Sequence, residues 1–310
     1  MMSISRRDLL CGGAAVGAAA LLPKFALGAE PKAFRFVHMT DFHVQPEMRA
    51  PQGMEAALKH AMKKRPDLVM LGGDLVMDSV SASRERTKVQ WDIFSSLLAS
   101  NCHVPAKYCI GNHDIWGWDK VRSQTSGNEA LWGKNWFLEV ANLSKTYHSF
   151  EAGGWKWIVL DTVHKAGSTY EGLVDADQLA WLTRELDTAD NGQPIIIVSH
   201  IPLFSPSPMV YGYDATSGSW KVSGSMVTKN FNEVKKLFDS RPNVKLCVSG
   251  HIHLVDRYDY NGVSYLCNGA VCGAWWLGKN KDFDPGYVVI DLYRDGTFKH
   301  EFVKWGWKPA

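Results

Sequence analysis

Short apolar runs that each end in a polar cluster recur along this chain, and this alternation restricts its possible folds more than any other feature. The first three runs and the clusters that follow them are 33–39 with Thr-Asp-Phe-His, 68–71 with Gly-Gly-Asp, and 106–110 with Gly-Asn-His-Asp. Segments with helical spacing, near 54–62 and 87–99, separate them. The repeated order of strand, polar loop and helix predicts parallel strands with crossover helices. In such sheets, ligands bind beyond the carboxyl ends of the strands.

The second half of the chain continues this pattern and then changes. The sequence predicts a hairpin (147–150 and 155–160), a helix (175–186), an apolar strand ending in Ser-His (194–198), a helix (230–238) and a strand before Gly-His-Ile-His (244–248). A possible helix lies earlier, at 129–140. The last part predicts short antiparallel strands at 257–260, 262–268, 286–291 and 297–303. Segment 204–224 is rich in Gly, Ser, Pro and Tyr without periodicity, which indicates a rim or lid. We expect a single α/β domain of mixed sheets.

His251 and His253 are two residues apart just past an apolar run. In extended chain the intervening residue points the other way, so both imidazoles can face one side of the strand end. Neutral imidazole is the commonest protein ligand for transition metals of intermediate softness. A His-x-His pair is more often structural, so its meaning depends on the other strand ends.

The polar residues at the strand ends form a set that suits two metal ions. In chain order they are Asp41, His43, Asp74, Asn112, His113, His200, His251 and His253. Carboxylates, an amide and imidazoles suit Fe, Mn or Zn. A carboxylate can join two ions about 3.5–4 Å apart by giving one oxygen to each. Any one of these residues could be a cap or a satisfied core residue, but polar groups at five buried strand ends would each need a separate explanation.

The ordered pattern D-x-H, G-D, G-N-H-D, H, G-H-x-H resembles the calcineurin-like metallophosphoesterases, from Asp41 to His253. The chain is most similar to the bacterial branch of cyclic-nucleotide phosphodiesterases and acid-phosphatase-like enzymes. The resemblance implies a four-layer α-β-β-α sandwich. It also implies a binuclear-metal hydrolase of phosphate esters.

The resemblance also implies a role for each residue. Asp41, His43 and His253 would hold one metal ion; Asn112, His200 and His251 would hold the other; Asp74 would bridge them. His113 would face the substrate phosphate with Asn112, stabilise charge in the transition state and act as the general acid. A metal-bridging hydroxide would be the nucleophile.

Two positions near these motifs leave questions about the site. The carboxylate that orients His113 is left open between Asp114 and Asp78. Met77 stands where some relatives have Asp. Because this residue is Met, the position also lacks the tyrosinate that colours purple acid phosphatases, which argues against a purple Fe(III) enzyme.

Aromatic residues and the remaining histidines have two possible roles. Trp116, Trp118, Trp275 and Trp276 follow the G-N-H-D and G-H-x-H motifs, so they either line the pocket and stack on a base, sugar or aromatic leaving group, or pack in the core. We expect the remaining histidines to be structural or exposed, with His164 the one that could approach the pocket; they are His38, His60, His103, His148, His164 and His300.

The amino terminus has the form of an export signal. Arg6 and Arg7 precede a Gly/Ala-rich apolar run over 9–22, and small residues at Ala26 and Gly28 suit cleavage. We expect a twin-arginine signal peptide over 1–28 and the mature domain over 29–310, with an uncleaved anchor as the alternative. The precursor would meet the twin-arginine export machinery, and the product would be periplasmic or secreted.

Cargo of this export route folds before export, in a reducing compartment, so no disulfide framework is expected. The one pair that could close later is Cys267 with Cys272.

The charge balance limits the classes of partner. The chain has 34 basic and 32 acidic residues, and loss of a leader carrying Arg6, Arg7, Lys24 and Asp8 would bring the net charge near zero. This gives no electrostatic reason to expect a nucleic-acid polymer or an anionic membrane as partner. No sequence feature sets the oligomeric state.

We therefore expect an exported enzyme acting on a small phosphate ester, with diesters favoured over monoesters by the resemblance. The alternatives are a phosphomonoesterase or nucleotidase, and a non-catalytic, metal-stabilised extracytoplasmic binding protein. The presence of His113 beside seven predicted ligands argues against the last, because a structural site needs no free acid.

Overall fold

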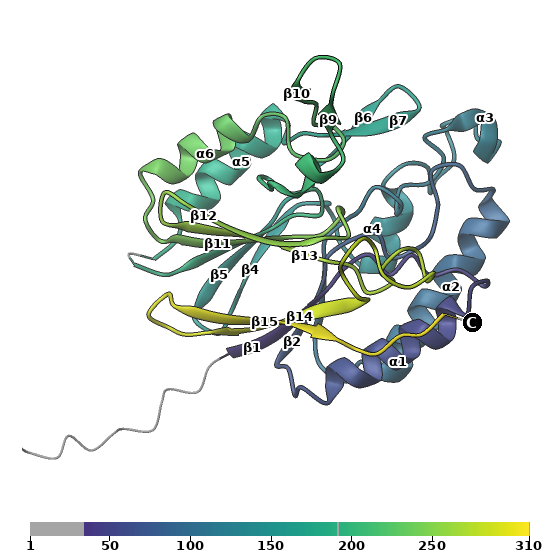
Figure 1. Ribbon diagram of the computed structural model, residues 1–310, viewed down its shortest axis with the longest axis horizontal. Helices are drawn as coiled ribbons and strands as arrows, with labels where there is room; N and C mark the ends of the chain where they lie inside the picture. The colour runs from purple at the N-terminus through teal and green to yellow at the C-terminus, as the bar shows by residue number, and fades with distance from the viewer. Residues whose placement is uncertain (1–33, 191, 310) are drawn as a thin grey trace, which may run out of the picture. The chain divides into compact units, whose positions relative to one another are not determined.

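Two large β-sheets lie face to face in the computed structural model, which describes residues 34–190 and 192–309 (Figure 1). All of the described residues belong to one unit, Lys32–Ala310. The signal peptide predicted over 1–28 and the domain boundary predicted at 29 lie outside the described residues. None of the described helices is both long and apolar enough to cross a membrane.

The five-stranded sheet has the order β15-β14-β1-β2-β3. Its strands are β1 (Phe34–Met39), β2 (Leu68–Leu71), β3 (Ala106–Tyr108), β14 (Gly286–Leu292) and β15 (Phe298–Lys304). The three amino-terminal strands are parallel, and α1 (Ala50–Met62) and α2 (Arg84–Asn101) connect them. This confirms the predicted crossover pattern.

The six-stranded sheet has the order β12-β13-β11-β8-β5-β4, in which the four central strands are parallel. Its strands are β4 (His148–Ala152), β5 (Trp155–Val159), β8 (Ile195–Val198), β11 (Val244–Ser249), β12 (Val255–Tyr260) and β13 (Val263–Asn268). The antiparallel strands predicted near the carboxyl terminus are present, but they divide between the two sheets: β12 pairs with β13, and β14 pairs with β1 and β15.

Strand alternation divides the apolar side chains among three layers. In β8, Ile196 and Val198 pack between the two sheets, whereas Ile195 and Ile197 pack under the helices α5 (Ala176–Asp187) and α6 (Phe231–Asp239). The strand reads as a continuous apolar run because both of its faces are buried. The five-stranded sheet is covered in the same way by α1 and α2, which gives the four-layer α-β-β-α order (Figure 1).

The described chain also has shorter elements outside the two large sheets. They are α3 (Lys120–Ser123), α4 (Asn135–Ala141), β6 (Val163–Ala166), β7 (Thr169–Gly172), the 3-10 turn η1 (Ser207–Val210), β9 (Tyr213–Asp214) and β10 (Ser219–Trp220). The helix predicted at 129–140 begins later, because the carboxylate of Glu129 accepts the backbone N–H groups of Ser126 and Gly127 and holds a turn there. The hairpin β6–β7 was not predicted from the sequence.

The loops after the parallel strands of both sheets meet at one edge. Asp41 N–H donates to Gly73 O (2.9 Å), and His43 N–H donates to Asp74 O (3.0 Å). Gly250 N–H donates to the carbonyl of His200 (3.1 Å). Main-chain hydrogen bonds therefore fix the first polar cluster beside the second, and the fourth beside the fifth.

Candidate metal centre

Five of the predicted metal ligands have a left-handed backbone, which few non-glycine residues adopt. Their φ angles are 57° at Asp41, 43° at His43, 51° at Asp74, 71° at His251 and 58° at His253. Each such conformation costs on the order of 1–3 kcal/mol and persists only where the surrounding structure holds it. Such strain clusters at functional sites, and here all five residues lie in one site.

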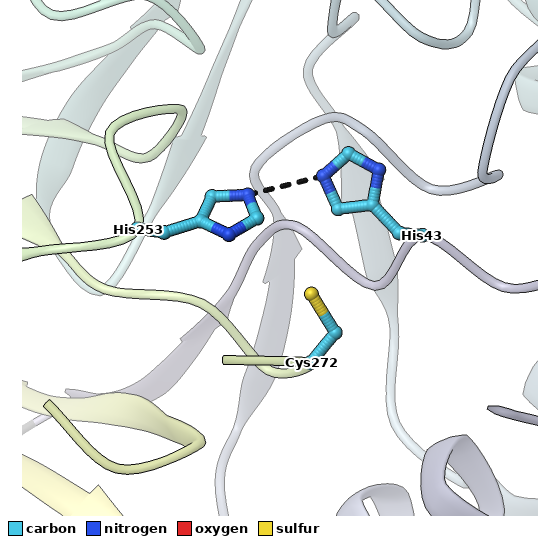
Figure 2. A group of neighbouring side chains, drawn as sticks. All are labelled: His43, His253 and Cys272. Carbon is cyan, nitrogen blue, oxygen red and sulfur yellow. Dashed lines mark hydrogen bonds between the residues drawn. The ribbon is translucent and has the colours of Figure 1, made fainter. Parts of the chain in front are cut away.

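One group of nitrogen and oxygen atoms forms around His43 and His253. The two Nε2 atoms are 3.1 Å apart, and the rings point toward one another (Figure 2). His253 Nε2 lies 3.2 Å from Asp41 Oδ1, and His43 Nε2 lies 3.6 Å from Asp74 Oδ2. These atoms belong to residues whose side chains are almost fully buried.

A second group forms around His200. Its Nε2 lies 3.1 Å from Asp74 Oδ2 and 3.2 Å from Asn112 Oδ1. Asp74, His200 and His251 also offer one ligand atom each within 4.8 Å of one another. Because the same oxygen of Asp74 approaches both His43 and His200, this carboxylate joins the two groups.

Main-chain carbonyls hold the outer nitrogens of three histidines. His200 Nδ1 contacts Gly72 O (2.8 Å), His253 Nδ1 contacts Gly273 O (2.7 Å), and His251 Nε2 contacts Ser225 O (2.9 Å). A carbonyl only accepts, so each of these nitrogens carries the proton. In the neutral form of each ring, the inner nitrogen then directs its lone pair toward the site, which is the second-shell arrangement of metal-binding histidines.

Burial and neighbouring charges set the protonation of the site. Burial lowers the pKa of His43 to about 4 and, together with the positive charge of His200, that of His251 to about 3. Burial opposes ionisation of Asp41 and Asp74, but the surrounding histidines outweigh it and hold the pKa of both carboxyls below the ordinary value. Burial lowers the pKa of His200, but the negative charge of Asp74 outweighs burial and raises this pKa to about 9. A metal ion bound there would therefore displace a proton.

The donor set fits two metal ions. Carboxylate, amide and imidazole donors without thiolate suit Fe, Mn or Zn. Two imidazole nitrogens that face each other at 3.1 Å beside carboxylates form an arrangement that a cation stabilises. One ion fits between Asp41, His43 and His253, the other fits beside Asn112, His200 and His251, and Asp74 reaches both.

His113 lies beside this centre with its ring perpendicular to that of His43, at 4.6 Å between centroids. Its backbone N–H donates to Asp74 Oδ1 (2.8 Å), and its Nδ1 contacts the carbonyl oxygen of Met77. That carbonyl is the orienting partner that the sequence left open. Neither proposed carboxylate is used: Asp114 accepts the N–H groups of Leu75, Val76 and Gly111, and Asp78 accepts that of Ser81.

Cys272 is a neighbour of the site that the sequence did not reveal. Its Sγ offers a ligand atom within 4.8 Å of those of His43 and His253, and the thiol lies below the two rings (Figure 2). Burial raises the pKa of the Cys272 thiol well above its ordinary value, with Asp41 adding to the effect, so the sulfur is neutral. The five described cysteines are free, so the possible pair Cys267–Cys272 is not formed.

A cavity of about 500 Å³ opens over the centre. Six of the eight predicted site residues line it, which are His43, Asp74, Asn112, His113, His251 and His253, while Asp41 and His200 are fully buried. Segment 204–224 contributes to the rim, as predicted, through Pro208, Tyr211, Gly212, Lys221, Val222 and Ser223.

Of the four tryptophans considered from the sequence, Trp275 lines the cavity, whereas Trp116, Trp118 and Trp276 are buried in the core. None of the six remaining histidines is among the residues lining this cavity, His164 included.

The sequence model of the calcineurin-like phosphoesterases matches residues 34–255, which is most of the chain. The chain belongs to this family. It is a metal-dependent hydrolase of phosphate esters, and groups of candidate metal ligands lie together among its described residues.

Relatives of this phosphoesterase include named phosphodiesterases. A 3',5'-cyclic-nucleotide phosphodiesterase of Nostoc sp. is 26% identical over 84% of this chain and 88% of its own length. The 3',5'-cyclic adenosine monophosphate phosphodiesterase of Escherichia coli is 26% identical over 76% of this chain and 73% of its own. The fold is similar to that of a dimetal phosphatase from Danio rerio, with a TM-score of 0.62 at 16% identity over 89% of this chain and 98% of that one.

Proposed function

We propose that this phosphoesterase is an exported phosphodiesterase with two metal ions. The observation that carries the proposal is the position of Asp74 Oδ2, which lies 3.6 Å from His43 Nε2 on one side and 3.1 Å from His200 Nε2 on the other. Asp41, His43 and His253 would hold one ion, Asn112, His200 and His251 the other, and Asp74 both. Bound there, the ions would polarise the phosphate and supply hydroxide from water near neutral pH.

His113 is the proposed general acid. Its Nδ1 is held by the carbonyl of Met77, which fixes the ring and leaves Nε2 for the substrate. This nitrogen would protonate the leaving oxygen, so that no free alkoxide is released. Asn112 lines the cavity beside it and would contact the phosphate through its side chain.

Apart from the two proposed metal ions, little free positive charge lines the cavity, which supports a diester over a monoester. A phosphodiester carries one negative charge, whereas a monoester near neutral pH carries up to two. Lys221 is the one Lys or Arg among the residues that line the cavity, and its Nζ lies 2.6 Å from Asp214, so it is already paired. The names of the Nostoc and Escherichia coli relatives support the same preference and suggest 3',5'-cyclic nucleotides as the first substrates to test.

Export remains part of the proposal. Arg6 and Arg7 before the apolar run support recognition of the precursor by the twin-arginine machinery and release into the periplasm or the medium. Replacement of both arginines by lysine should keep the protein in the cytoplasm with its leader uncleaved. Export of that variant at the normal rate would refute the proposed twin-arginine route.

The function is tested by comparing bis(p-nitrophenyl) phosphate with p-nitrophenyl phosphate as substrates of the Mn²⁺-loaded protein. We expect faster turnover of the diester, its loss in Asp74→Asn, and a smaller decrease in His113→Ala, because p-nitrophenolate leaves with little need of a general acid. Faster turnover of the monoester would identify a phosphatase instead. If neither ester is hydrolysed at full metal occupancy, a phosphoesterase of broad substrate range is contradicted.

A further inference from the structure

The lining of the cavity above the metal centre has two chemically different parts. The floor carries the histidines and carboxylates described above. The rest includes a wall of aromatic and apolar side chains, which are Tyr170, Pro208, Tyr211, Val222, Met226 and Trp275. A ligand that fills the cavity therefore joins an anionic group to a flat or apolar one.

Trp275 is fixed on this wall by its buried neighbour. Trp275 and Trp276 both have left-handed backbones, with φ angles of 47° and 73°. The Trp276 indole donates from Nε1 to His43 O (3.1 Å) and packs against Gly53, where a Cβ would come within 2.1 Å of the ring. Since Trp276 is locked inward, the tight turn directs Trp275 outward, where it stays 42% exposed.

The Trp275 ring lies next to the site of chemistry. Its centroid is 4.8 Å from that of His253 and 6.1 Å from that of His43. The ring is therefore backed by two predicted ligands and lines the cavity with its remaining surface. A partly exposed indole that close to a phosphate site offers stacking surface to a planar group.

Tyr211, in segment 204–224, is the second aromatic residue of the wall. Asn280 Nδ2 donates to Tyr211 Oη (3.4 Å) and to the carbonyl of His253 (3.2 Å), so one side chain ties the rim to the G-H-x-H loop. Lys281 Nζ lies 5.1 Å from the centre of the Tyr211 ring. These contacts hold an aromatic ring that is otherwise 45% exposed.

We propose that the wall formed by Trp275 and Tyr211 is a nucleobase-binding site for substrates that carry a single phosphodiester. This proposal rests on the proposed function for the phosphate half of the substrate. The wall offers stacking surface but little free positive charge, because Lys221 pairs with Asp214 and Lys281, beside the Tyr211 ring, is not among the residues that line the cavity. It therefore suits a nucleoside cyclic monophosphate better than a pyrophosphate-linked nucleotide, whose second phosphate would need its own cation.

The test compares two phosphates that differ by a base. Binding of adenosine 5'-monophosphate and of ribose 5-phosphate to the full, Mn²⁺-loaded chain is measured by calorimetry. Trp275→Leu removes the stacking surface, and Trp275→Phe restores part of it. Trp220→Leu is the matched control, because Trp220 is 53% exposed but does not line the cavity.

We expect the nucleotide to bind about tenfold or more tightly than the sugar phosphate, in line with the strength of base–aromatic stacking. Trp275→Leu should abolish this preference and raise KM for 3',5'-cyclic adenosine monophosphate by a similar factor with little change in kcat. Trp275→Phe and Trp220→Leu should keep the preference. An unchanged preference in Trp275→Leu would overturn the nucleobase site, and faster turnover of a pyrophosphate-linked nucleotide would overturn the single-phosphate part.

The two proposals fail in different ways. If the wild-type chain binds the nucleotide through Trp275 but hydrolyses no phosphodiester, the proposed function is wrong and the nucleobase site stands. If it hydrolyses bis(p-nitrophenyl) phosphate while Trp275→Leu has no effect on either nucleotide measurement, the phosphodiesterase stands and the nucleobase site is wrong.

Discussion

The floor of the cavity and its rim are built in opposite ways. The floor and the buried layer behind it comprise the eight residues predicted from the strand ends, and most of them are buried and held by main-chain hydrogen bonds. The rim comprises segment 204–226 and Trp275, with Tyr211 and Trp275 about half exposed and held by a few side-chain contacts. The floor has no freedom to adapt, whereas the rim can change by single substitutions without disturbing the core.

This difference separates chemistry from selectivity. A change in the floor should reduce turnover of every phosphate ester, because all of them meet the same ions and the same acid. A change in the rim should alter the apparent affinity for some esters and leave others unaffected. The following predictions test this separation, from the largest expected effect to the smallest.

Asp74→Asn should have the largest effect. The two ions would lose their common carboxylate, and the loss of their charge stabilisation, worth several kcal/mol, corresponds to a drop of roughly ten-thousandfold in kcat/KM. Initial rates with a diester and with a monoester should fall together. Asp78→Asn is the matched control, since Asp78 accepts Ser81 N–H outside the cavity, and it should retain activity. Equal losses in the two variants would argue against a special role for Asp74.

His113→Ala should lower kcat by about a hundredfold to a thousandfold, the usual contribution of a general acid. Metal content should stay the same. The loss should be greater for a substrate with an alkoxide leaving group than for a p-nitrophenyl ester, whose leaving group needs less protonation. His103→Ala, at an exposed histidine, is the control. A general-acid role would be refuted by equal losses on both kinds of substrate.

Trp276→Ala and Trp275→Ala should differ in stability although the residues are adjacent. Trp276 is 1% exposed, and its truncation should cost about 3 kcal/mol or more in the free energy of unfolding. Trp275 is 42% exposed, and its truncation should cost less than about 1 kcal/mol. Urea denaturation measures both. Similar losses in the two variants would mean that Trp275 on the rim contributes as much to stability as a buried core residue.

His148 should make the protein sensitive to acid through a residue outside the site. Burial lowers the pKa of His148 to about 4, with Lys107 adding to the effect. Because the unfolded chain takes up this proton first, stability is lost as pH falls below about 6.5 and the loss is complete near pH 4. Through His148 alone, the free energy of unfolding should be about 2 kcal/mol lower at pH 5 than at pH 8.

His148→Phe keeps a ring beside Phe150 and should remove this part of the pH dependence. Denaturation at pH 5 and pH 8 is the measurement, with His103→Gln as the control. If the difference between the two pH values is the same in His148→Phe and in the wild type, the buried imidazole is not its source.

Much of the fold could be predicted because burial leaves a clear trace in the sequence. β2 has the bounds expected for it, Leu68–Leu71, since both of its faces are covered and the whole strand is apolar. The pairing of the carboxyl-terminal strands could not be predicted in the same way. Alternation identifies β12 to β15 as strands, but whether each joins one sheet or the other depends on contacts between distant segments, such as β14 with β1.

The site shows the same limit at the level of single atoms. Its eight polar residues could be listed because they follow strands in a family order. The groups that orient them could not, because the carbonyls of Met77, Ser225 and Gly273 belong to the main chain and any residue supplies one. The left-handed turn that directs Trp276 inward and Trp275 outward is also invisible in residue types.

The most direct test of the account is the number of metal ions bound per chain, measured by mass spectrometry after Mn²⁺ loading and removal of excess metal. The account predicts two ions in the wild type and one in each of His43→Ala and His200→Ala, since each histidine serves a different ion and Asp74 serves both. A single ion in the wild type, or the same two ions in both variants, would contradict the binuclear centre.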